Sequence, residues 1–309
     1  MDNATTEKDM SWFDTDTNTD TCKYTLAYAE NIETASSLAC VRACPKKYEY
    51  EYIKLMQIKK EREYLTFGTN GHEALAIFFG KGQNALVEHF DSKAYQDDDQ
   101  KLMSGKIKAL VTQFVFSDEA ASIKPIMVEE KIEYECEGKT IAGKIDLVGE
   151  VGGKKWLIDH KFLSDISDIN SFKANSQMDS YLLALSKMGV HCEGIIWNLI
   201  RKPTIRVKQT ETIDEYLVRL QDDVETRPDF YYMFLPVKRT PDEIQENNPE
   251  IAMQIKYLNW LKETGNFFKD RSRCGDYGGC QFRSLCTPGL SLDEFETRES
   301  KHPELEGGR

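Results

Sequence analysis

Residues 130–162 constrain the fold of this chain more than any other stretch. Apolar and charged residues alternate in "KIEYEC" (131–136), as in a strand with one buried face. A turn then leads to a second apolar stretch, 140–148, and a Gly-Gly turn leads to a third, 156–162. We therefore predict three consecutive antiparallel strands that carry charged side chains among apolar ones.

The segments on either side of these strands have the apolar period of helices. Helices are expected over 36–62, 67–82, 98–116, 171–189, 213–226 and 240–264, with two further strands over 192–200 and 204–211. This order predicts an α/β fold in which helices flank a small mixed β-sheet.

The second and third strands, "GKIDLV" and "WLIDHKF", carry the residues of greatest chemical interest. Because side chains alternate along a strand, Asp159 and Lys161 should share one face and His160 the other. The short turn should make the two strands neighbours, so that Asp146 and Asp159 could come close. Two carboxylates beside an amine suit a Mg²⁺ or Mn²⁺ ion that activates water. The alternative is an ion-pair cluster without catalysis, although its burial would be costly.

Length and charge set limits on the class of protein. The 309 residues carry a net charge of −12, which does not suit a protein that coats nucleic acid by bulk charge. A nucleic-acid enzyme with its own metal ions remains compatible with this charge. There is no apolar run of 18 residues and no basic-then-apolar leader, so we expect a cytoplasmic protein. We divide the chain into a flexible leader (1–21), one domain (22–292) and an acidic tail (293–309).

The chain has eight cysteines, three of which fall within 13 residues near the C-terminus: Cys274, Cys280 and Cys286. Without a secretion signal a disulfide framework is not expected, so this cluster predicts a metal site. Structural zinc sites usually have two to four residues between paired ligands, whereas five residues separate these cysteines. Zinc and buried free thiols are the competing interpretations. We assign no metal to Cys22, Cys136 or Cys192.

The order of these motifs resembles that of the PD-(D/E)XK nuclease superfamily, in its RecB-type branch. "GKIDLV" followed by Asp-x-Lys matches the core of that branch, "QMDSY" matches its Gln-x-x-x-Tyr helix, and "GTNGH" resembles its Gly-x-x-x-His helix. The resemblance implies a restriction-endonuclease-like core. It assigns metal ligation to His72, Asp146 and Asp159, and catalytic or strand-holding roles to Lys161 and to two residues of the helix, Gln177 and Tyr181. Glu129 or Glu130 could be a further ligand, although a solvated strand edge is the favoured interpretation for either.

The cysteines fit the same resemblance. "CPKKY" is similar to the N-terminal element of iron–sulfur members, such as the AddB nuclease domain and the CRISPR-adaptation exonucleases. The resemblance then implies a [4Fe–4S] cluster that joins the two ends of the domain and is held by Cys44, Cys274, Cys280 and Cys286. The gap between the first two late cysteines is longer than in many members. Cys40 is a reserve candidate for Cys44.

Taken together, the resemblance implies a Mg²⁺- or Mn²⁺-dependent deoxyribonuclease, an exonuclease acting on DNA ends or single strands. Recombination, repair, phage replication and CRISPR adaptation are the settings it allows, with protein partners in such complexes. No Gly-x-x-x-x-Gly-Lys-Ser/Thr loop is present, so a nuclease without a motor is expected. The alternative is a non-catalytic nucleic-acid-binding or assembly subunit that keeps the nuclease fold.

Overall fold

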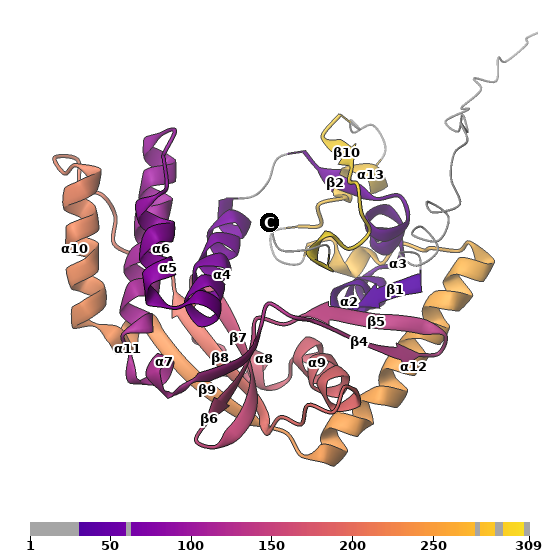
Figure 1. The fold of residues 1–309 in the computed structure, drawn as a ribbon. Coiled ribbons are helices and arrows are strands. Elements are labelled where there is room, and N and C mark those ends of the chain that lie inside the picture. Colours follow the sequence, from indigo (N-terminus) through magenta and orange to yellow (C-terminus); the bar gives the residue numbers. More distant parts are fainter. Residues whose placement is uncertain (1–30, 60–62, 276–278, 288–292, 306–309) are drawn as a thin grey trace, which may run out of the picture.

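A mixed five-stranded sheet forms the centre of the molecule (Figure 1). The computed structural model describes residues 31–59, 63–275, 279–287 and 293–305, so the predicted leader over 1–21 lies outside the described residues. The strand order is β3 (Lys124–Val128), β6 (Leu147–Val151), β7 (Lys154–Leu163), β8 (Gly194–Arg201) and β9 (Tyr232–Lys238). Only β7 and β8 run parallel, and the other neighbours are antiparallel. The predicted small mixed sheet with flanking helices is confirmed.

Two smaller sheets extend the structure towards the chain ends. One has the order β1 (Ile32–Thr34), β5 (Lys139–Lys144) and β4 (Lys131–Cys136). The other pairs β2 (Met56–Ile58) with β10 (Phe295–Thr297), which are far apart in sequence. The C-terminal segment therefore packs beside the N-terminal helices, as the yellow and indigo ribbons in Figure 1 show.

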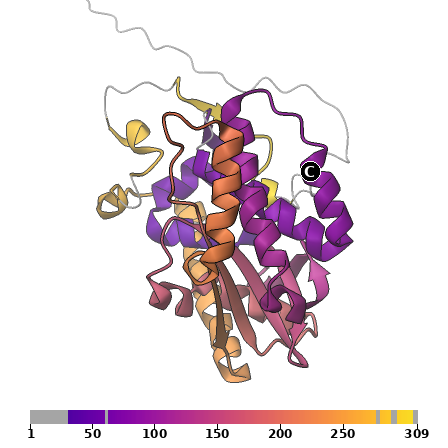
Figure 2. The ribbon, with the colours of Figure 1, turned by 90° about the vertical axis from the view of Figure 1, so that its left-hand side faces the viewer.

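Helices cover both faces of the central sheet. One apolar core joins the face that contains Ile158 and Ile196 to four helices: α4 (Glu63–Lys81), α5 (Gln83–Asp91), α6 (Asp98–Val115) and α10 (Ile213–Thr226). Figure 2 shows α10 and α6 in front of the strands. A second core joins the opposite face, which contains Leu157 and Trp197, to α2 (Ala35–Ala43), α9 (Ser176–Lys187) and α12 (Pro241–Thr264).

The remaining described elements are short: α3 (Pro45–Tyr48), the π-helical turn η1 (Glu49–Ile53), α7 (Asp118–Ser122), α8 (Ile169–Lys173), α11 (Pro228–Tyr231), η2 (Arg271–Arg273), α13 (Arg283–Cys286) and η4 (Pro303–Leu305). None of the described helices combines the length and apolar character that a membrane span needs.

Several predicted elements have different limits in the structure. The helix expected over 36–62 is broken at Cys44, which has an extended backbone (φ −161°, ψ 106°), because the following Pro45 disfavours a helical residue before it. The strand expected over 204–211 is wrong. Both edges of β8 are already paired, with β7 and β9, so that segment finds no strand partner there.

The most consequential difference lies in the predicted strand 140–148. The structure divides it into β5 and β6, which belong to different sheets, and the chain bends between them at Ile145 and Asp146. Asp146 therefore lies at the junction of two sheets and not within a strand. From this position its side chain contacts α4 and the main chain of β7.

Candidate active site

Strand β7 presents an acid and an amine on the same face, as the alternation of its side chains predicts. Asp159 Oδ2 lies 2.6 Å from Lys161 Nζ, and the Asp159 side chain is 8% exposed. In the parallel register Asp159 is opposite Trp197 of β8, on the face that α9 and α12 cover. His160 points to the opposite face and is buried there.

Asp146 joins this pair from the bend between β5 and β6. Its Oδ2 accepts a hydrogen bond from the main-chain N–H of His160 (2.9 Å) and lies 3.1 Å from Nδ1 of His72 on α4. Three elements that are distant in sequence thus bring His72, Asp146 and the Asp159–Lys161 pair to one place. This convergence is the central feature of the candidate site.

The buried charges change the acidities of these groups in opposite directions. Burial, followed by the negative charge of Asp146, raises the pKa of Asp159 to about 6. Burial acts in the same direction on Asp146, but the charge and hydrogen bond of His72 lower its pKa well below the usual range. Burial lowers the pKa of Lys161, and the two carboxylates more than offset this effect, so its pKa is raised. The amine is therefore charged at neutral pH.

The Asp159 carboxylate is buried, and its Oδ2 lies 2.6 Å from Nζ of Lys161. The negative charge of the neighbouring Asp146 acts against its ionisation. Two carboxylates that oppose each other in this way suit a hard cation, which would offset their repulsion. Within the described ranges, no three His, Cys, Asp or Glu side chains form a ready group for a metal ion. Mg²⁺ usually keeps several waters and takes one or two carboxylates, so Asp146 and Asp159 fit it.

His72 is turned towards Asp146. Burial lowers the pKa of His72, while the charge of Asp146 and the hydrogen bond to it raise the pKa by more. Nδ1 of the imidazole is thus engaged with the carboxylate in this structure. It would have to exchange this contact to act as a metal ligand.

Gln177 and Tyr181 form a hydrogen-bonded pair on α9. The amide Nε2 of Gln177 donates to the Tyr181 hydroxyl over 3.0 Å. The ring of Tyr181 packs directly on Gly143 of β5, where an added Cβ would come within 2.4 Å of it. Because Gly143 is three residues before Asp146, the pair lies beside the strand that leads to the site.

The two candidate acids before β4 differ in their surroundings. Glu129 has a positive φ of 54° and its N–H donates to the carbonyl of Asp146 over 2.9 Å. Its carboxylate is 2.5 Å from Nζ of Lys144. Glu130 is exposed, and its carbonyl accepts from Ile145. Glu129 is therefore attached to the bend that carries Asp146, with its charge balanced by a lysine.

Trp197 and Asn198 of β8 are buried behind the site, and the sequence did not single out either of them. Trp197 is fully buried; its ring lies 5.8 Å from Lys161 Nζ, and its Nε1 donates to the carbonyl of Phe172. On the other face, the ring of His160 stacks on Phe79 and its Nδ1 lies 2.9 Å from the amide of Asn198. Only the parallel pairing of β7 with β8 reveals these contacts, since neither partner is near in sequence.

A second feature lies at the chain ends. A cavity of about 700 Å³ is lined by all four cysteines expected to bind a cluster: Cys44, Cys274, Cys280 and Cys286. The main chain of Asp270 links Cys44 and Cys274. Its N–H donates to Cys44 Sγ (3.4 Å), and its carbonyl accepts from Cys274 Sγ (3.9 Å). The early cysteine and the three late ones thus converge in space.

The thiols fit a thiolate-bound group in kind and number. In the part of the chain that is described, however, no three of them form a closed set around a metal position. Cys40 does not line the cavity; it is buried behind Cys44, and its burial raises its pKa to about 12. Cys136 is buried in the core and Cys192 is half-buried, and neither lines the cavity.

A protein family and solved structures resemble this chain. The family model of the PD-(D/E)XK nuclease superfamily matches residues 34–287. No curated protein sequence matches the chain. A provisionally named exonuclease from Eubacterium rectale has a similar crystal structure, with a TM-score of 0.50 and 11% identity over 84% of this chain and 92% of that one. A phage-related exonuclease from Haemophilus somnus 129PT gives a TM-score of 0.33 and 19% identity, over 64% of this chain and 83% of that one.

Proposed function

The chain belongs to the PD-(D/E)XK nuclease superfamily, and on this premise we propose that it is a Mg²⁺- or Mn²⁺-dependent nuclease that hydrolyses phosphodiester bonds in DNA. The single observation that carries the proposal is the convergence of Asp146, Asp159 and Lys161 at the junction of β5, β6 and β7. A buried carboxylate beside a partly buried one, whose charge raises the pKa of the first, supports a site for a divalent cation.

In the proposed mechanism, Asp146 and Asp159 would hold the ion, and His72 would be a further ligand if it exchanged its contact with Asp146. The ion, when bound, polarises the phosphodiester and makes its bound water more acidic. Lys161 holds the attacking water in line and offsets the charge that develops on the phosphate. The ring of Trp197, which packs on Phe172, lies beside the lysine amine. Gln177 and Tyr181 contact the phosphate backbone of the strand.

We further place the protein in the RecB-type branch and propose that it acts as an exonuclease on DNA ends or single strands. The order of His72, Asp146, Asp159-x-Lys161 and Gln177-x-x-x-Tyr181 supports the branch. Under this proposal residues 22–292 form one nuclease domain, whose two ends meet at the cysteine cavity. Four thiols in that cavity support a [4Fe–4S] cluster as the group that joins the ends.

The nuclease proposal is tested with an end-labelled single strand in Mg²⁺ or Mn²⁺. Replacing Lys161 with Ala should reduce cleavage by about 100-fold or more, since a charged group beside the reacting phosphate is lost. Lys154→Ala is the matched control, because Lys154 lies on the same strand but pairs with Glu193 at the surface.

Equal cleavage by the Lys161→Ala variant and the wild type would contradict the assigned role of Lys161. If wild-type protein with its fold intact leaves the strand uncut under every metal condition, the molecule is a non-catalytic binding or assembly subunit. The cleavage products of 5′- and 3′-labelled strands would give the polarity in the same assay.

The cluster is tested separately by anaerobic purification with iron, sulfide and zinc analysis. We expect brown protein with iron and sulfide, and loss of both in a Cys280→Ser variant but not in a Cys192→Ser control. Colourless protein that contains stoichiometric zinc would show that the four cysteines form a zinc site and not an iron–sulfur cluster. That result would leave the nuclease proposal unaffected.

A further inference from the structure

The rim of the cysteine cavity is strongly basic, although the whole chain has a net charge of −12. Among the described residues that line it, six are basic and two are acidic. The basic residues are Arg42, Lys47, Lys269, Arg271, Arg273 and Arg283, and the acidic residues are Glu51 and Asp270. Such a local excess of positive charge favours an anionic ligand.

Not all six basic side chains stabilise the negative charge of a cysteine thiolate. Lys47 is the one whose charge favours the thiolates of Cys40 and Cys280, against the larger opposing effect of burial, and it lies 3.8 Å from Glu51. Arg271 and Arg283, by contrast, have exposed side chains. No described carboxylate lies within 4.0 Å of either guanidinium. Their charge is therefore available to a ligand that arrives from solvent.

The basic rim adjoins the candidate active site through Arg42. This exposed residue lines the cavity, and its Nη2 donates to Oγ of Ser176 over 3.3 Å. Ser176 directly precedes Gln177, which is bonded to Tyr181. Arg42 therefore contacts the residue that precedes the pair proposed to hold the strand, and it also belongs to the rim.

We propose that Arg42, Arg271 and Arg283, the arginine rim, bind the phosphates of a nucleic-acid strand that continues beyond the catalytic residues. Guanidinium groups suit this role because they bind phosphate with two parallel hydrogen bonds and stay charged. The proposal rests on the nuclease function proposed above. It makes the rim a second strand-binding surface, remote from the bond that is cut.

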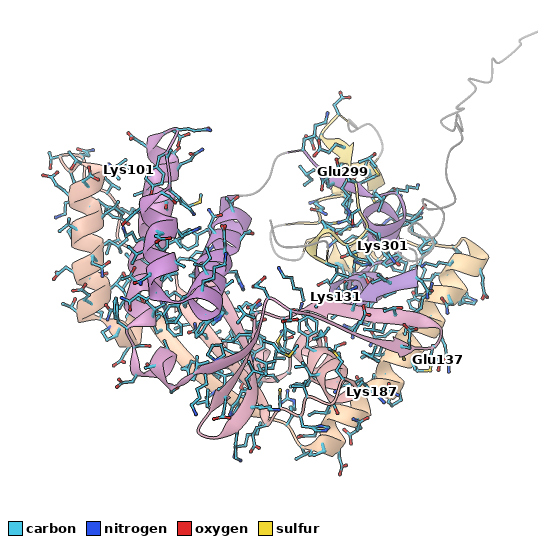
Figure 3. All side chains as sticks on the ribbon, in the orientation of Figure 1. Lys101, Lys131, Glu137, Lys187, Glu299 and Lys301 are labelled. Atoms are coloured by element: carbon cyan, nitrogen blue, oxygen red, sulfur yellow. The ribbon has the colours of Figure 1, made fainter. Side chains whose placement is uncertain are left out.

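The test measures binding without cleavage, in EDTA, with a fluorescent single strand of about 30 nucleotides, several times the length that one small binding site covers. The variant is Arg271→Gln with Arg283→Gln. Removing two phosphate contacts should reduce the slope of log Kd against log salt by about 1.4. The control is Lys155→Gln with Lys187→Gln, which removes the same charge from exposed positions. Figure 3 shows Lys187 at the far end of α9.

Strand length supplies a second readout. A strand of about 4 nucleotides that fills only the active site should bind the rim variant and wild type equally, whereas the long strand should bind the variant more weakly. Equal melting temperatures and equal iron content in the two proteins show that neither fold nor cavity has changed.

Equal salt slopes for rim variant, control and wild type would overturn the proposal, as would a wild-type protein that binds no strand. Equal salt slopes would mean that the arginines only balance negative charge in the cavity or bind an acidic protein. If a nucleic-acid strand binds through the arginine rim but is never cut, the proposed nuclease function is wrong and the proposed binding role of the rim is retained. The two proposals can therefore fail separately.

Discussion

At the scale of single residues, the site depends on charges that are buried on one face of β7 and an uncharged histidine on the other. Asp159 and Lys161 share the face next to α9, while the ring of His160 lies between Phe79 and Phe114. Burial lowers the pKa of His160 to about 4, because an imidazolium there would be poorly solvated. His160 also fixes Asp146 through its main-chain N–H.

The buried neutral state of His160 predicts a pH-dependent stability. The unfolded chain protonates this residue near its ordinary pKa of 6.5, whereas the folded chain resists protonation until about pH 4. Between these values the unfolded state binds more protons, so the free energy of unfolding falls as pH decreases, by up to about 3 kcal/mol. A His160→Gln variant should lose correspondingly less stability than wild type between pH 6.5 and pH 4, measured by urea unfolding.

His191 provides the control for this experiment because it is exposed on the surface. His191→Gln should follow the wild-type curve across the same pH range. If the His160→Gln and wild-type curves stay parallel, protonation of His160 does not contribute to the loss of stability in acid.

At the scale of elements, the contact between α4 and β7 sets the position of His72. Gly71 lies directly against the ring of Phe162, which follows Lys161 in β7. A Cβ at residue 71 would come within 2.4 Å of that ring. The helix can therefore approach the strand closely only with glycine at this position.

This contact predicts opposite effects for two glycines of the same helix. Gly71→Ala should lower the free energy of unfolding by about 1–3 kcal/mol, because the added methyl forces helix and strand apart. It should also reduce cleavage by moving His72. Gly68→Ala, where nothing lies within 4 Å of the added Cβ, should raise stability by up to about 1 kcal/mol. Urea unfolding of both variants checks the pair, and similar effects at both positions would refute the packing argument.

At the scale of the whole molecule, a buried glutamate holds the two ends of the described chain together. Glu33 of β1 is fully buried and accepts hydrogen bonds from Tyr48, Ser37 and Lys301. Lys262 of α12 lies 3.3 Å away. The segment 293–309, separated above as an acidic tail, is thus anchored over its described part, 293–305, by Lys301 and by the pairing of β10 with β2.

Removing the charge of Glu33 should destabilise the entire fold. Burial raises the pKa of Glu33, but Lys301 and Lys262 lower it by more, so the carboxylate is charged. Glu33→Gln would leave two lysines facing each other without their counter-ion, at a cost of about 3 kcal/mol or more in the free energy of unfolding. The control is Glu137→Gln, which breaks an exposed ion pair with Lys256 and should cost about 1 kcal/mol or less. Figure 3 shows both Lys301 and Glu137.

Equal melting temperatures for the Glu33→Gln and Glu137→Gln variants would show that the buried network does not hold the chain ends. Loss of the C-terminal contacts alone can be followed by limited proteolysis after Arg298, whose N–H donates to the carbonyl of Leu55. We expect faster cleavage there in the Glu33→Gln variant.

The sequence by itself determined most of the helices and the placement of an acid and an amine on one strand face. Alternation placed Asp159 and Lys161 on one face of β7, and the apolar period predicted helices where the structure has those that begin at Ile213 and Pro241. These features depend on neighbours in the chain, which the sequence displays directly.

Only the tertiary structure decided where Asp146 lies and what surrounds the site. The bend at Asp146 arises because β5 pairs with β4 in one sheet while β6 pairs with β7 in another. The contacts of Lys161 with Trp197, of His160 with Asn198 and of Glu33 with Lys301 join residues remote in sequence. Such contacts depend on which strands and helices pack together. The free energy of that packing is distributed over the whole core, so no local sequence pattern predicts it.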